Sequence, residues 1–283
     1  MSFKDELYPA VAAGVIVGGC MYPFEALKKL LQGTEQPSLL RLVREHGLLT
    51  PQYINRVLQE THKYRWYRGG TPFVTYVGVV TTVQLLTEAQ LRKAGLFHDG
   101  AALPWMAASG AVCGVVGSPF ATAMENVVVQ QQQPAGGLAP RGPRAAVAEM
   151  LRHGGARRFL KSAHLIATRD GVFTSFMFVL NPRLKRAVAE YGPAAQLAAS
   201  LPLCFIGAAV THPFDTIATM SQKTHGALST REALRRVCAK RRGVLSLWDG
   251  LSCRFVLFTV FANGIPFVQS RVQQLLHVAT VTR

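Results

Sequence analysis

A short proline motif recurs three times in this chain of 283 residues. Each copy contains Pro-Phe, and the copies span 22–25, 118–121 and 211–215. Their prolines are 96 and 94 residues apart, and each stands late in an apolar stretch. Self-similarity at a fixed period indicates a repeat architecture. Because the repeat is about a third of the chain, it is a structural module, and membrane transporters are often built from such modules around a central site.

The chain also has apolar stretches long enough to be helices that cross a membrane. Only 16% of its residues are charged, against about 25% in soluble domains. Small residues recur ahead of the prolines, as in Gly14-x-x-x-Gly18 and Gly110-x-x-x-Gly114, and such spacings permit close helix contact. The six stretches are 6–31, 72–93, 103–131, 163–186, 195–222 and 252–277.

We therefore predict an all-α membrane protein with six transmembrane helices in three tandem pseudo-symmetric repeats. The three repeats cover 1–98, 99–194 and 195–283 and together form one domain over 1–283.

The basic residues, which give a net charge of +16, are concentrated in three segments. Residues 32–70, 134–161 and 223–242 hold 19 of the 31 Lys and Arg, and each segment follows one of the prolines. Such a bias orients membrane proteins and suits anionic lipid head groups. Within these segments, 143–151 and 231–237 have the pattern of short surface helices. A nucleic-acid-binding bundle would explain the charge but not the apolar stretches, so we expect membrane lipids and no nucleic acid as partners.

No motif for catalysis or metal binding is visible. The five cysteines are scattered without C-x-x-C spacing, and no phosphate-binding loop or catalytic triad is present. We expect no enzyme, no metal and no cofactor. The first six residues have neither a signal-peptide nor a transit-peptide pattern, so we expect internal targeting information.

The repeats resemble the mitochondrial carrier family over essentially the whole chain. That family carries P-x-[D/E]-x-x-[K/R] on its odd-numbered helices, and the pattern is complete in 23–28. The third copy departs from it at Ala218, and the second at Ala121 and Met124. The resemblance implies a central cavity between odd helices kinked at Pro23, Pro119 and Pro213. It also implies a multi-pass protein of the mitochondrial inner membrane, with both termini toward the intermembrane space and with the basic loops and surface helices on the matrix side.

In the family, acids and bases on the odd helices form a matrix gate, here Glu25, Lys28 and Asp215. The Lys28–Asp215 pair is retained, whereas Ala121 and Ala218 stand where an acid and its partner base would be, which leaves no orphan charge. Glu25 is left over, and we expect it to pair locally with Lys29 or to be partly protonated. The alternative is that Glu25 and Lys28 form a lipid-interface pair with no role in gating.

The opposite gate of the family is weaker in this chain. Ala89, Pro182 and Ser270 stand at its acidic positions, so no ring of ion pairs can form there. Pro182 is also expected to bend the fourth helix or to end it early.

Arg169 and Asp170 match the R-[D/E] pair at the family's second substrate contact point. The resemblance implies a carrier for amino acids or carnitine-type solutes, with a carboxylate on Arg169 and an amine near Asp170. The alternative is a structural pair, or a pair that meets water in a cavity. Arg254 is a further substrate-binding candidate at the same height.

A second family element, aromatic-[K/R]-G, opens the even helices. It is complete at 67–69 and weakened at 160–162 and 248–250. The free N–H groups at a helix start bind anions. The resemblance implies bound cardiolipin, and Asp249 would repel its phosphate at the third site. The cardiolipin-binding residues would be Arg68, Gly69, Lys161 and Ser162.

Two functions fit these features. One is a carrier that moves a small zwitterionic or anionic metabolite by alternating access. The other is a transport-inactive, carrier-fold structural subunit of a larger inner-membrane complex, such as a respiratory or ATP-synthase assembly, because most gate charges are lost while the helix-packing Gly and Pro residues persist.

Overall fold

The computed structural model describes residues 3–33, 69–96, 102–132, 142–223, 228–240 and 242–281, and the secondary structure in these ranges is helical throughout. The fourth predicted apolar stretch forms α7 (Ala163–Ser175), the π-helical turn η2 (Phe176–Leu180) and α8 (Asn181–Ala187) in succession. The other long helices are α1 (Phe3–Gly33), α4 (Gly70–Lys93), α5 (Leu103–Gln131), α9 (Gly192–Lys223) and α11 (Leu251–Val281). A helix thus covers each predicted apolar stretch.

Four segments in the described part of the chain are long and apolar enough to cross a membrane. They are Glu6–Lys29, Leu103–Gln131, Ala189–Lys223 and Gly243–His277. These segments contain all of α5 and α9 and most of α1 and α11. An all-helical protein with several candidate membrane spans is therefore confirmed, whereas six spans in three repeats stay a prediction.

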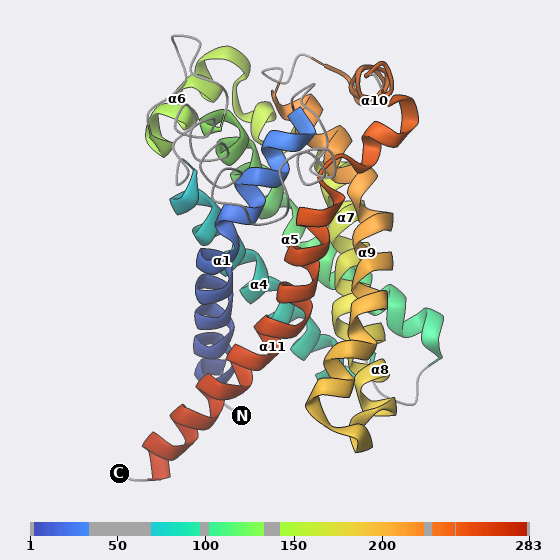
Figure 1. Cartoon of the computed structure of the whole chain (residues 1–283). Helices are drawn as coiled ribbons and strands as arrows, with labels where there is room; N and C mark the ends of the chain where they lie inside the picture. The colour runs from blue at the N-terminus through green and yellow to red at the C-terminus, as the bar shows by residue number, and fades with distance from the viewer. Residues whose placement is uncertain are drawn as a thin grey trace, which may run out of the picture.

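The long helices contact one another in the order of the sequence. Each of α1, α4, α5, α7, α9 and α11 packs against the next, and α11 packs against α1 (Figure 1). The short helices α6 (Pro143–Gly154) and α10 (Thr230–Cys238) both lie at one end of the molecule, here called the α6/α10 end. Both chain ends lie at the opposite end, the terminal end (Figure 1).

The short helices α6 and α10 confirm the two predicted surface helices. At the start of α10, the Ser229 hydroxyl accepts a hydrogen bond from the Glu232 N–H, and the Glu232 carboxylate accepts one from the Ser229 N–H. The Ser229 N–H stabilises the ionised carboxylate and so lowers the pKa of Glu232.

Glycines bring neighbouring long helices into close contact. A Cβ atom on Gly14 would lie 2.8 Å from the Gly78 Cα atom, and one on Gly114 would lie 2.2 Å from the Asp170 carbonyl oxygen. A Cβ atom on Gly207 would lie 2.4 Å from the Phe258 ring. The predicted small-residue contacts are therefore present, and they join α1 to α4, α5 to α7, and α9 to α11.

Prolines lie inside single helices, including Pro23 in α1, Pro119 in α5 and Pro213 in α9. A proline cannot donate to the carbonyl four residues earlier, and in a membrane that carbonyl needs another donor. Side chains supply it at Pro119, Pro213 and Pro266. The three bonds are Ser118 Oγ to Val115 O (2.8 Å), Trp248 Nε1 to Ala209 O (2.9 Å) and Asn181 Nδ2 to Ala262 O (3.0 Å).

The fourth apolar helix does not end early at Pro182, because it continues past this residue to Ala187, and its helix type changes just before the proline. The α-helical geometry of α7 ends at Ser175, and α8 resumes at Asn181 with Pro182 in its first turn, where its missing N–H is tolerated. The five-residue π-helical turn between them keeps the helix continuous.

Candidate functional site

Seven buried charged side chains meet in the last three turns of α1, α5 and α9 and on α7. We call this set the ion cluster, and it has four carboxylates but only three bases. Its members are Glu25, Lys28, Lys29, Glu125, Arg169, Asp170 and Asp215. Charges in a membrane are costly unless they are paired. The geometry of the ion pairs therefore decides whether they offset the cost of burying these charges.

The predicted Lys28–Asp215 pair joins α1 to α9. Lys28 Nζ lies 3.0 Å from Asp215 Oδ2 and 2.8 Å from Glu25 Oε2. Glu25 is also 3.7 Å from Lys29, so the local contact expected for it exists, but Lys28 is its nearer partner. Gln32 Nε2 donates to Asp215 Oδ2 at 2.7 Å and strengthens the same junction.

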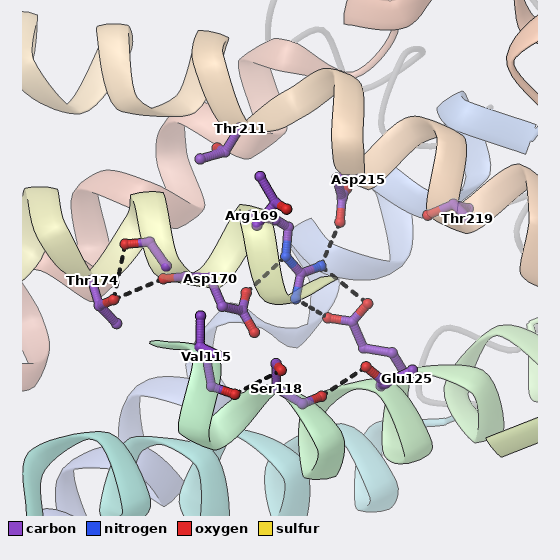
Figure 2. Close-up of polar contacts among 12 residues, drawn as sticks. Val115, Ser118, Glu125, Arg169, Asp170, Thr174, Thr211, Asp215 and Thr219 are labelled. Carbon is purple, nitrogen blue, oxygen red and sulfur yellow. Dashed lines mark hydrogen bonds and ion pairs between the residues drawn. The ribbon is translucent and has the colours of Figure 1, made fainter. Parts of the chain in front are cut away.

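Arg169 connects α5, α7 and α9 (Figure 2). Its Nη2 and Nη1 donate to the two oxygens of Glu125 at 2.6 and 3.0 Å. Nη1 also donates to Asp215 Oδ1 at 2.7 Å, and Nε donates to Asp170 Oδ1 at 2.8 Å. Arg169 is 1% exposed. The guanidinium expected to hold a substrate carboxylate is thus bonded to three carboxylates of the protein.

Lys29 and Glu125 are functional candidates that the sequence analysis missed. Lys29 Nζ donates to Thr219 Oγ1 at 2.9 Å and lies 3.6 Å from Glu125 Oε2. Glu125 stands one helical turn beyond Ala121, the position where the family pattern places an acid. The available signal was its isolation, since Glu125 is the single charged residue in the sequence of α5. Lone acids in membrane helices mark functional sites.

The C-terminal ends of α1, α5 and α9 are tied together next to the ion cluster. A helix leaves its last four carbonyls without intrahelical partners. Here Gln130 Nε2 donates to Gln222 O at 2.8 Å, which joins α5 to α9. Lys223 Nζ donates to Lys29 O at 2.6 Å, and Lys240 Nζ donates to Gln32 O at 2.8 Å. These bonds and the ion cluster together close the α6/α10 end between α1, α5 and α9.

A cavity of about 50 Å³ adjoins the ion cluster, which is room for a few water molecules. Arg254 and Asp170 line it, and each is at least nine-tenths buried. Among the described residues, neither Arg254 Nε nor Asp170 Oδ2 has a hydrogen-bond partner. The other polar residues in its wall are Tyr76, Thr81, Gln84 and Arg169. The cavity therefore presents one unsatisfied donor on a cation and one unsatisfied acceptor on an anion.

The terminal end has a different character. Its ion pairs include Arg92 with Glu88 within α4, and Lys93 with Glu6 at 3.1 Å. Both bases in these pairs are more than two-fifths exposed. A larger cavity of about 530 Å³ lies between α8, α9 and α11, and its wall includes Lys185, Asn263 and Phe267.

The motif residues at the predicted lipid sites lie at the starts of α4, α7 and α11. Arg68 lies outside the described residues. Gly69 (φ +91°), Ser162 (φ +67°) and Gly250 (φ +89°) are left-handed and precede α4, α7 and α11. The Ser162 hydroxyl, next to Lys161, is buried and has no partner in the described part of the chain. The three starts therefore share one backbone conformation, although only the first keeps the full motif.

Comparisons with known proteins do not assign the chain to a family. A scan of the sequence against protein-family models found no match, and a search of the curated proteins found none either.

Proposed function

We propose that this protein is a solute carrier of the mitochondrial inner membrane with a mitochondrial-carrier-like fold. It would move a small zwitterionic or anionic metabolite by alternating access. The observation that carries the proposal is that Arg254 and Asp170, buried and of opposite charge, each have one polar atom without a hydrogen-bond partner among the described residues, on the wall of one cavity beside a closed end of the bundle. Buried charged side chains that keep an unsatisfied polar atom are candidates for binding a ligand.

A zwitterion matches this cavity chemically. Its carboxylate would accept from the guanidinium of Arg254, and its ammonium would donate to Asp170 Oδ2. This assignment shifts the carboxylate contact from Arg169, which is occupied by Glu125, Asp170 and Asp215, to Arg254. Arg169 then belongs to the gate.

The ion cluster is the proposed gate at the α6/α10 end. Ion pairs can break and re-form as helices move. Glu25, Lys28 and Asp215 keep the gate role implied by the family resemblance, and Lys29, Glu125 and Arg169 join them. In the orientation implied by that resemblance, this end faces the matrix, the termini face the intermembrane space, and cardiolipin binds near Gly69, Lys161 and Ser162.

Uptake into proteoliposomes tests the proposal. Purified protein would be screened for exchange of labelled amino acids, carnitine esters, nucleotides and carboxylates. Arg254→Gln is expected to abolish uptake with the helical content intact. Arg271→Gln, at an exposed position further along α11, is the matched control and is expected to leave uptake unchanged. Absence of exchange for all four solute classes would refute a carrier.

A second candidate is a transport-inactive structural subunit of a larger inner-membrane complex. The observation in its favour is that Ala89, Pro182 and Ser270 carry no charge, so the terminal end lacks the ring of ion pairs that would close it. Native gel migration from mildly solubilised membranes separates the two functions. Migration near 30.8 kDa plus detergent supports an independent carrier, and comigration with a respiratory or ATP-synthase assembly supports a subunit.

A further inference from the structure

We propose that Asp170 couples the cavity to the gate, so that the cationic group of a ligand is what opens the α6/α10 end. The inference rests on the proposed function and names the specificity determinant of the same site. A ligand with an anionic group alone would bind at Arg254 without opening the gate.

The carboxylate of Asp170 has one oxygen bonded within the ion cluster and one oxygen available to a ligand in the cavity. Oδ1 accepts from Arg169 Nε at 2.8 Å, whereas Oδ2 has no hydrogen-bond partner among the described residues. The residue lines the cavity, and it is 6% exposed. A ligand that donates to Oδ2 therefore acts on the same carboxylate that orients Arg169.

Arg169 transmits the effect of a ligand bound at Asp170 to the gate. Through Glu125 and Asp215 its guanidinium holds α5 and α9 together, and Asp215 is also bound by Lys28 of α1. Releasing Arg169 would thus loosen the contacts among three helices at once. No other base of the ion cluster has an ion pair with a residue of the cavity wall among the described residues.

The charge balance gives the direction of the effect. Three bases share four carboxylates in the ion cluster, and the oxygen left without a partner belongs to Asp170. An ammonium at Oδ2 adds a cation to those of the ion cluster and Arg254, and it competes with Arg169 for Asp170 and repels it. A ligand carboxylate at Arg254 leaves the Asp170–Arg169 pair intact. Zwitterions should therefore open the gate, and simple carboxylates should only bind.

Hydrogen exchange measured by mass spectrometry on the wild-type protein in lipid nanodiscs tests this inference. The probes are matched pairs that differ in the ammonium group: glycine and acetate, β-alanine and propionate, 4-aminobutyrate and butyrate. At least one zwitterion is expected to raise exchange of the backbone amides in 25–33 and 215–223 about fivefold or more, the low end of typical coupling between sites. Its matched carboxylate should not. Exchange in α6 (143–154) is the internal control and should stay constant.

Equal acceleration by the matched carboxylate would overturn the inference, and so would the absence of acceleration by every zwitterion. Asp170→Asn should abolish the acceleration while carboxylate binding persists, and retention of the acceleration in this variant would also refute it. Because this variant can lose folding through Arg169, Asp170→Glu serves as the second variant and should keep the response. Uptake by proteoliposomes without ammonium-dependent opening would refute the coupling alone, whereas the loss of both would refute the carrier as well.

Discussion

The two ends of this molecule are held together in different ways. At the α6/α10 end, seven buried charges from α1, α5, α7 and α9 bond to one another, and polar side chains cap the last carbonyls of α1 and α9. At the terminal end, the Arg92–Glu88 pair lies within one helix, and Ala89, Pro182 and Ser270 stand where a charged ring would need acids.

Because of this difference, ion pairs of the same residue types contribute different free energies at the two ends. An exposed ion pair contributes about 0–1 kcal/mol because water screens it. Removal of one partner from a buried pair costs about 3–5 kcal/mol because the other charge stays buried. Under the proposed carrier function, a gate that closes firmly and opens reversibly needs buried pairs of the second kind, and the α6/α10 end has them.

The largest expected effect comes from Arg169→Gln. The change leaves Glu125, Asp170 and Asp215 without their shared cation, and it should lower the free energy of unfolding by about 3–5 kcal/mol. The matched control, Arg92→Gln, removes an exposed i,i+4 partner of Glu88 and should cost about 0.3–0.5 kcal/mol. Denaturant unfolding in detergent measures both. Equal losses would remove the distinction between the two ends.

Gly114→Ala is the next in size. The added Cβ atom would sit 2.2 Å from the Asp170 carbonyl oxygen, so α5 and α7 must separate near the cluster at a cost of about 1–3 kcal/mol. Gly19→Ala in α1 is the control, since its Cβ atom meets nothing within 4 Å, and it should stabilise the helix by up to about 1 kcal/mol. Thermal unfolding in detergent measures the two shifts, and the same sign for both would contradict this packing.

Trp248→Phe should cost about 1 kcal/mol or slightly more. The change leaves the Ala209 carbonyl, already without the Pro213 N–H, without its side-chain donor. Trp105→Phe removes a comparable bond to Leu96 O near the terminal end, but Trp105 is 54% exposed. Water can replace that bond, so the expected loss is below about 0.5 kcal/mol. Chemical unfolding of both variants, followed by circular dichroism, measures the difference, and a larger loss for Trp105→Phe would argue against it.

Ser162→Gly should have the smallest effect and the opposite sign. Ser162 is left-handed at φ +67°, in a conformation that glycine adopts without steric penalty, so the variant should be more stable by about 1 kcal/mol. Gly69→Ala at the equivalent start of α4 should lose stability instead. A lower melting temperature for Ser162→Gly would indicate that the buried hydroxyl has a partner worth more than the strain.

The sequence predicts the parts of this fold that are encoded locally. Apolar stretches and their glycines predict the long helices and their contacts, and the repeated Pro-x-acid pattern leads directly to Lys28 and Asp215. Glu125 does not follow from this pattern, which places its acid at position 121, although a residue one turn further lies on the same helix face. The roles of Arg169 and Arg254 depend on which carboxylates α5 and α9 bring within reach of α7, which is a property of packing.

The most direct test of the account is the accessibility of the cavity from the two ends. Thr81→Cys in the cavity wall, in a background without the five native cysteines, would be labelled with a membrane-impermeant thiol reagent in vesicles of known orientation. Label is expected to enter from the terminal end and not from the α6/α10 end, and Arg169→Gln is expected to admit it from both. Equal labelling from both ends in the unmodified gate would contradict a closed ion cluster.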